Sequence, residues 1–218
     1  MEMWKKITPP EISETPEENE KTVQVMETTG VHITRRVNSE LALEKELPWH
    51  FEKGTSYHCF SWGDVDSLTY LRVIVKQQKL KFALVSTWCM AETDIKEIFS
   101  WVEKGYIGRV DFYVGEIFKG SYAKESELLF KLCSKYNCRL VIFRNHSKIM
   151  LAFGEKFDAV IESSANVNTN PRSEQAVITV NSDLASWYKN IFDNINPFNS
   201  DFQQPPIFEV GGVINGQT

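Results

Sequence analysis

A regular alternation of strand-like and helix-like segments runs along residues 82–195, and it constrains the fold more than any other feature. Residues 82–88 form a near-continuous apolar run, which is typical of a strand buried on both faces. Residues 91–105 then place apolar side chains at helical spacing, and residues 109–114 and 122–136 repeat the order of strand and helix. Such helices bury their apolar faces by packing on the sheet. The sequence therefore predicts an α/β fold with a mixed, largely parallel sheet flanked by helices.

The two ends of the chain lack this periodicity. Residues 1–38 are expected to form a partly disordered N-terminal arm, rich in proline and glutamate at its start, with a candidate hairpin at residues 23–37. Residues 196–218 are expected to form an extended C-terminal tail, in which Ile207, Phe208 and Val210 are apolar enough to dock on a partner. The chain of 218 residues therefore has one predicted domain, at residues 39–195, between two arms.

The composition narrows the range of environments and partners. No apolar run approaches the roughly 20 residues that a membrane span requires, and the N-terminus lacks the apolar core of a secretion signal. The four cysteines include no C-x-x-C pair, which favours reduced thiols and a cytoplasmic protein. A net charge of −5 argues against a protein that coats nucleic acid by bulk electrostatics, although it leaves room for a local basic groove.

A candidate site begins where a strand-like run at residues 140–143 ends. His146 and Lys148 follow this run two residues apart, so in an extended segment both side chains point to the same side and can meet one ligand. The basic residues placed around this site by the sequence are Arg139, Arg144, Lys148, Lys156 and Arg172.

A second strand-like run, at residues 158–161, also ends in polar residues. Ser164 and Asn166 follow it closely, and Glu174 comes after a turn-rich segment. The combined set offers an imidazole nucleophile, cations for phosphate charge, and hydroxyl and amide donors for phosphate oxygens. This chemistry suits phosphoryl transfer.

These residues resemble the phospholipase D superfamily, whose motif is H-x-K-x4-D followed by G-S-x-N or G-S-x-x-N. His146 and Lys148 match the first part, while Ser164 and Asn166 match the second. The sequence departs from the motif at two positions. Phe153 stands where the family has aspartate, and Ser163 stands where it has glycine. The resemblance implies a phospholipase D-like α/β fold across most of residues 54–195.

The resemblance also implies a mechanism. With one motif per chain, two chains pair so that one His146 attacks phosphorus while the other protonates the leaving oxygen. Lys148 and Asn166 would hold the non-bridging oxygens, Ser164 would donate a further hydrogen bond, and Glu174 would fix the tautomer of His146. The expected protein is thus a homodimeric, metal-independent phosphodiesterase without a cofactor, and most similar to the small nucleases, which cleave DNA or RNA.

Three further residues are expected to bind substrate, and two other interpretations remain open. Arg144, Arg172 and Asn168 are the candidate substrate-binding residues beside the catalytic set. The first alternative is an inactive module that keeps the fold and binds nucleic acid or serves in protein assembly, and the substitutions at Phe153 and Ser163 favour it. The second is an ordinary α/β domain in which His146 and Lys148 only end a strand.

Overall fold

The computed structural model describes residues 38, 41–63, 65–168 and 172–211. All of these residues belong to one compact unit. The hairpin predicted at residues 23–37 lies outside the described residues.

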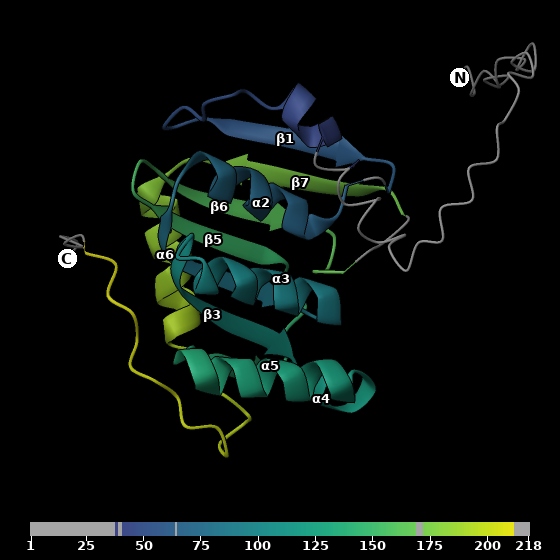
Figure 1. Cartoon of the computed structure of the whole chain (residues 1–218), viewed down its shortest axis with the longest axis vertical. Coiled ribbons are helices and arrows are strands. Elements are labelled where there is room, and N and C mark those ends of the chain that lie inside the picture. The colour runs from purple at the N-terminus through teal and green to yellow at the C-terminus, as the bar shows by residue number, and fades with distance from the viewer. Residues whose placement is uncertain (1–37, 39–40, 64, 169–171, 212–218) are drawn as a thin grey trace, which may run out of the picture. The chain divides into compact units, whose positions relative to one another are not determined.

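The described residues form one seven-stranded sheet with the strand order β1-β7-β6-β5-β2-β3-β4. Its two edge strands are therefore β1, which lies at the top of the sheet in Figure 1, and β4. The strands are β1 (Ser56–Ser61), β2 (Leu80–Thr87), β3 (Ile107–Gly115), β4 (Leu140–Phe143), β5 (Ile149–Gly154), β6 (Asp158–Ser163) and β7 (Glu174–Thr179).

The mixed sheet is confirmed, but the expectation that it is largely parallel is wrong. Two of the six pairs that the structure describes are parallel, β2 with β3 and β3 with β4. The other four are antiparallel. The cause is the absence of a helix between β5, β6 and β7 in the element order, since neighbouring strands joined by short connections pair as hairpins. The alternation of strands and helices in the described residues holds only from β1 to β4.

Helices cover both faces of the sheet, as predicted. One face packs against α2 (Ser67–Gln77), α3 (Glu92–Glu103) and α5 (Ala123–Tyr136), and the other against α6 (Ser182–Asp193), which lies behind the strands in Figure 1. A four-residue helix, α4 (Phe118–Ser121), precedes α5. Among the described residues, no helix has both the length and the apolar character to cross a membrane.

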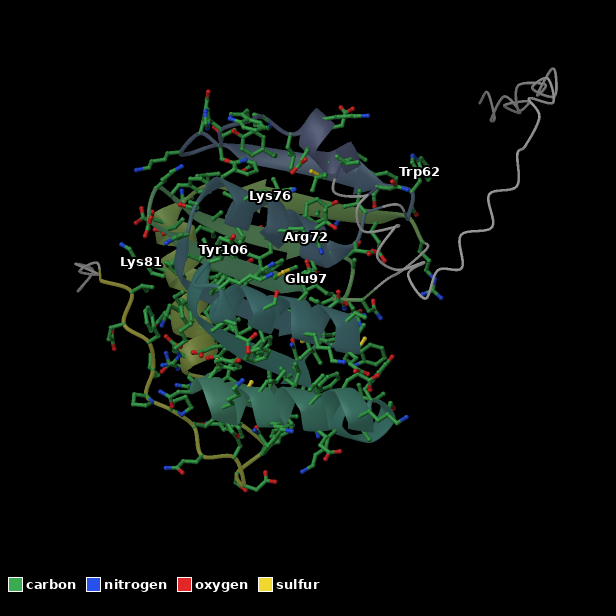
Figure 2. All side chains as sticks on the ribbon, viewed as in Figure 1. Trp62, Arg72, Lys76, Lys81, Glu97 and Tyr106 are labelled. Carbon is green, nitrogen blue, oxygen red and sulfur yellow. The ribbon has the colours of Figure 1, made fainter. Side chains whose placement is uncertain are left out.

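An ion pair links α2 to α3 on the first face of the sheet. The Arg72 guanidinium of α2 donates through Nε and Nη2 to the Glu97 carboxylate of α3, and both distances are 2.8 Å (Figure 2). Arg72 is 7% exposed, so this bidentate pair is shielded from solvent and fixes the helices side by side.

The segment predicted to be a tail packs along the edge strand β4. Asn199 bridges this strand, because its Oδ1 accepts from Ile142 N at 2.9 Å and its Nδ2 donates to Leu140 O at 2.7 Å. Gln204 forms a similar pair of bonds with Leu140, and Phe208 stacks on Phe82 with the ring centroids 4.9 Å apart. The apolar residues near the C-terminus therefore dock on the chain's own core, and the segment occupies an edge that would otherwise be open to pairing.

Candidate active site

The candidate site lies where the parallel and antiparallel halves of the sheet meet. Strands β2, β3 and β4 are parallel, so their carboxyl ends lie along the same border of the sheet. Strand β5 runs the other way and begins at this border. The end of β6 and the start of β7 reach the same border, because each strand is antiparallel to the one before it. The two motif halves, which follow β4 and β6, therefore come together.

His146 and Lys148 lie in the connection from β4 to β5 and not on a strand. The ammonium of Lys148 donates to the His146 carbonyl oxygen at 2.7 Å and lies 3.0 Å from Nδ1 of the same residue. An ammonium group can only donate a hydrogen bond, so Nδ1 is the acceptor in this contact. The imidazole is exposed, while Lys148 is partly buried.

The backbone around His146 is held by Asn145, which is 4% exposed. Its side-chain nitrogen donates to Ser86 Oγ at 3.0 Å and Tyr113 O at 2.9 Å, as well as to the carbonyl of Thr87 at 3.2 Å. Its oxygen accepts from Ser147 N at 2.8 Å. Asn145 thus ties the loop that carries His146 to the ends of β2 and β3.

Asn166 is anchored at the end of β2. Its Oδ1 accepts from Trp88 N at 3.2 Å and from Thr87 Oγ1 at 3.4 Å. Thr87 Oγ1 also accepts from Val167 N at 3.1 Å, so the backbone after β6 is fixed at two successive positions. With Oδ1 held in this way, the amide nitrogen is the group of Asn166 that can donate to a ligand.

The second half of the motif is joined to the first through the pairing of β5 with β6. Ser163 N donates to Lys148 O at 3.0 Å, which continues the ladder to the motif lysine. Ser164 Oγ makes a short hydrogen bond to the Glu174 carboxylate and accepts from Gln175 N at 3.0 Å. Within the described part of the chain, the His146 ring nitrogens have hydrogen-bond contact only with Lys148, so Lys148 occupies the place at Nδ1 that the resemblance assigns to Glu174.

Burial and neighbouring charges shift the pKa of Lys148 in opposite directions. Burial lowers the pKa of Lys148 below that of an ordinary lysine, while Cys89 and Glu174 oppose the shift as negative partners. Burial also raises the pKa of the Cys89 thiol, which Tyr122 and Lys148 partly counteract. Lys148 and Glu174 are therefore electrostatically coupled, so both halves of the motif influence the charge at the site.

The residues predicted to bind substrate differ in their surroundings. Arg144 and Arg172 are exposed near the two loops of the site. Asn168 is partly buried, and its Nδ2 donates to Cys89 Sγ at 3.6 Å.

Two of the five basic residues expected around the site lie at the opposite edge of the sheet. Arg139 precedes β4 and donates its backbone N–H to the buried Asp111 at 2.9 Å, and Lys156 follows β5 and donates to Gln77 O at 2.7 Å. The sequence places them close to the motif, but a strand separates each of them from it. Their inclusion in the basic groove is wrong.

Phe153 stands at the position of the family aspartate and is 4% exposed. It packs in the core beneath α6, with its ring centroid 5.9 Å from that of Phe82. A carboxylate would be buried among apolar groups here, so the packing accounts for the departure from the motif.

Three residues outside the set predicted from the sequence hold the motif in place, namely Trp88, Thr87 and Asn145. Trp88 was assigned to the end of an apolar strand, yet its indole lies beside His146 with the ring centroids 5.8 Å apart. The available signal was position, because Thr87 and Trp88 end a buried parallel strand just as Phe143 does.

Comparison of the sequence with protein-family models gives no match, and comparison with curated proteins gives none. The solved structures that match this chain include the following three. Polyphosphate kinase from Porphyromonas gingivalis is 14% identical with a TM-score of 0.49, and the match covers 68% of this chain and 27% of the kinase. Phosphatidylserine synthase from Haemophilus influenzae is 13% identical with a TM-score of 0.46, covering 63% of this chain and 37% of the synthase. NucT from Helicobacter pylori is 15% identical with a TM-score of 0.48, covering 66% of this chain and 100% of NucT.

The identities to these three proteins are all below 25% and the TM-scores all below 0.5, so the likeness assigns no family to the chain. This likeness concerns the arrangement of the elements, and it assigns no activity and no site residue to the chain.

Proposed function

We propose that this chain is a phospholipase D-like phosphodiesterase, acting as a metal-independent nuclease through His146. One observation carries the proposal. Lys148 lies 3.0 Å from the imidazole of His146, and Asn166 is anchored at the end of the neighbouring strand, so that one cation and one amide donor can meet the phosphate that the imidazole attacks.

The proposed reaction needs two imidazoles, and one chain supplies one. In a homodimer, a nitrogen of one His146 forms a bond to phosphorus while the bond from phosphorus to the leaving oxygen breaks. The His146 of the second copy gives its proton to that oxygen. This second imidazole then takes a proton from water, whose oxygen displaces the first histidine from phosphorus. The exposure of His146 supports this arrangement, because a second copy can reach it.

Substrate binding would change the hydrogen bonds of Lys148. A phosphate oxygen is a charged acceptor and competes well with a neutral imidazole for the ammonium group. Lys148 would then leave Nδ1 of His146 and offset the charge that develops on the phosphate. Glu174 lies close enough to act on the charge of Lys148. Its proposed role is to accept a hydrogen bond from Nδ1–H, after Lys148 has left and the imidazole has changed to the tautomer that carries its proton on Nδ1.

A second candidate function is a binding module without turnover. The contact between Lys148 and His146 favours it, because this contact satisfies the cation within the chain. Ser163 favours it as well, since a hydroxymethyl group replaces the glycine hydrogen at the edge of the site. Such a module would bind nucleic acid through Lys148 and would have no need of the imidazole.

Cleavage assays in EDTA separate the two functions. We expect the wild type to cleave single-stranded or double-stranded DNA or RNA, and we expect His146→Asn to abolish cleavage without loss of folding. Lys148→Ala is expected to raise the barrier by about 2–4 kcal/mol, as for other preorganised donors. His58→Asn and Lys156→Ala are the matched controls, because both residues lie away from the candidate site.

The binding module predicts a different pattern. Wild type would bind nucleic acid without cleaving it, His146→Asn would bind equally well, and Lys148→Ala would bind weakly. Cleavage that survives His146→Asn would contradict the proposed mechanism. Sedimentation of the wild type at micromolar concentration tests the dimer, and a monomer with full activity would exclude the two-histidine scheme.

A further inference from the structure

Trp88 contacts both halves of the motif although it belongs to neither. It directly follows β2 and is partly buried. Its indole lies beside the imidazole of His146, with the ring centroids 5.8 Å apart and the planes at 51°. Its backbone N–H donates to Asn166 Oδ1 at 3.2 Å. One residue at the end of a buried strand therefore contacts the histidine of one half and the asparagine of the other.

The fold leaves space for this indole at the end of β3. A Cβ on Gly115 would lie 2.6 Å from Trp88 Cδ1, closer than real contacts allow, and 3.0 Å from Asn145 O. Only glycine lets the indole lie against the backbone of β3 at this position. The ring is thus held between β3 and the loop that carries His146.

His146 has few other restraints. Its ring is exposed, and its polar contacts among the described residues are all with Lys148, whose ammonium group a phosphate would attract. Once Lys148 moves to a ligand, the indole of Trp88 is the contact seen among the described residues that still limits rotation of the imidazole, before any new hydrogen bond to Glu174 forms. An attacking group that rotates freely loses much of the benefit of its position.

We propose that Trp88 is a positioning residue of this site, which holds the imidazole of His146 in register with the amide of Asn166. The inference rests on the proposed function, because it concerns the same phosphate site. It gives the residue that follows β2 a role in positioning His146, although this residue is not part of the motif.

Kinetics provide the first test, with Trp88→Leu, Trp88→Phe and the control Trp187→Leu. Trp187 is an exposed indole on α6, 56% accessible, so its loss tests for a general effect of removing tryptophan. We expect Trp88→Leu to lower kcat on the order of 10- to 100-fold with little change in KM, and Trp88→Phe to restore most of the rate. A rise in KM with unchanged kcat would mean that the indole binds substrate, and it would overturn the proposal.

Proton NMR of the histidine rings provides a test that needs no activity. The chain has four histidines, so His146→Asn assigns the signals of His146. In the wild type the ring current of Trp88 should displace these signals, and the displacement should vanish in Trp88→Leu and persist in Trp187→Leu. Unchanged signals in Trp88→Leu would overturn the proposal. Should Trp88→Leu not fold, Gly115→Ala displaces the indole without removing it, and the same loss of displacement is expected.

The two tests also separate this inference from the proposed function. If the wild type cleaves no phosphodiester, the nuclease proposal fails and the NMR result alone decides the role of Trp88. If cleavage occurs and Trp88→Leu changes neither kcat nor the NMR signals of His146, the nuclease proposal stands and the positioning role is wrong.

Discussion

The two halves of the sheet are built differently and contribute differently to the candidate site. In the half from β2 to β4, helices separate parallel strands, and the strand ends supply buried groups that hold other residues in place. In the half from β5 to β7, strands follow each other without helices. Lys148 directly precedes β5, Ser164 and Asn166 follow β6, and Glu174 begins β7. The site exists because β5 pairs with β2, which brings these two sets together.

This comparison explains why the motif alone describes only part of the site. Asn166 belongs to the antiparallel half, but Thr87 and Trp88 of the parallel half fix its oxygen. His146 lies in the connection between the halves, and Asn145 ties that connection to β2 and β3. Preorganisation therefore depends on residues outside the motif.

The largest loss of stability is expected for Phe153→Ala. This substitution removes a core side chain of β5 on the face of the sheet that α6 covers. Phe153 is 4% exposed and packs against Phe82. We expect the free energy of unfolding to fall by about 3–5 kcal/mol, as measured by urea denaturation. Phe60→Ala is the control, since Phe60 is 63% exposed on β1, and it should cost less than about 1 kcal/mol. Equal costs would mean that the core assignment of Phe153 is wrong.

A smaller loss of unfolding free energy is expected for Asn145→Ala, which removes the hydrogen bonds between the His146 loop and the ends of β2 and β3. The substitution leaves the N–H of Ser147 and the carbonyls of Thr87 and Tyr113 without their partner. Each buried group left without a hydrogen bond lowers the free energy of unfolding by about 1–3 kcal/mol. Because the structure can partly relax, we expect a total loss of about 3 kcal/mol, measured by thermal or chemical denaturation. Asn168→Ala, whose side chain contacts only a thiol in the described structure, should have a much smaller effect. An unchanged free energy of unfolding in Asn145→Ala would contradict the role of Asn145 in tying the His146 loop to β2 and β3.

The smallest effect concerns the pH dependence of activity. Lys148 must be charged to offset a phosphate, so activity should fall as the pH rises through the pKa of Lys148. Burial lowers this pKa, and Glu174 opposes the shift. Glu174→Gln removes that opposition, so the alkaline limb of the pH–rate profile should move to lower pH. Glu155→Gln, at the far end of β5, should leave the limb in place. A shift to higher pH in Glu174→Gln would contradict the coupling.

The sequence predicted much of the fold through periodicity. The apolar runs at β2, β3 and β4 and the helical spacing of α3 and α5 all appear in the structure. The orientation of β5, β6 and β7 was missed, because the order of strands and helices was extended to a region that has no helices. The docking of residues 197–210 was missed as well, since Asn199 and Gln204 act through hydrogen bonds to an edge strand and leave no periodic signal.

The candidate site was predicted as far as local spacing reaches. His146 with Lys148, and Ser164 with Asn166, could be found because each pair lies within a few residues. Trp88 and Gly115 could not, because they approach the motif only through strand pairing and through the space that a glycine leaves. The same limit explains the errors at Arg139 and Lys156, which are close to the motif in sequence and at the other edge of the sheet in space.

The most direct test of the site is the position of a bound tetrahedral anion. Crystals soaked in tungstate should show the anion between Lys148, Asn166 and His146, with Lys148 Nζ moved from the imidazole to an anion oxygen. Such density would show that the two halves of the sheet form one phosphate site. Tungstate bound only elsewhere on the surface, with Lys148 still on His146, would contradict it.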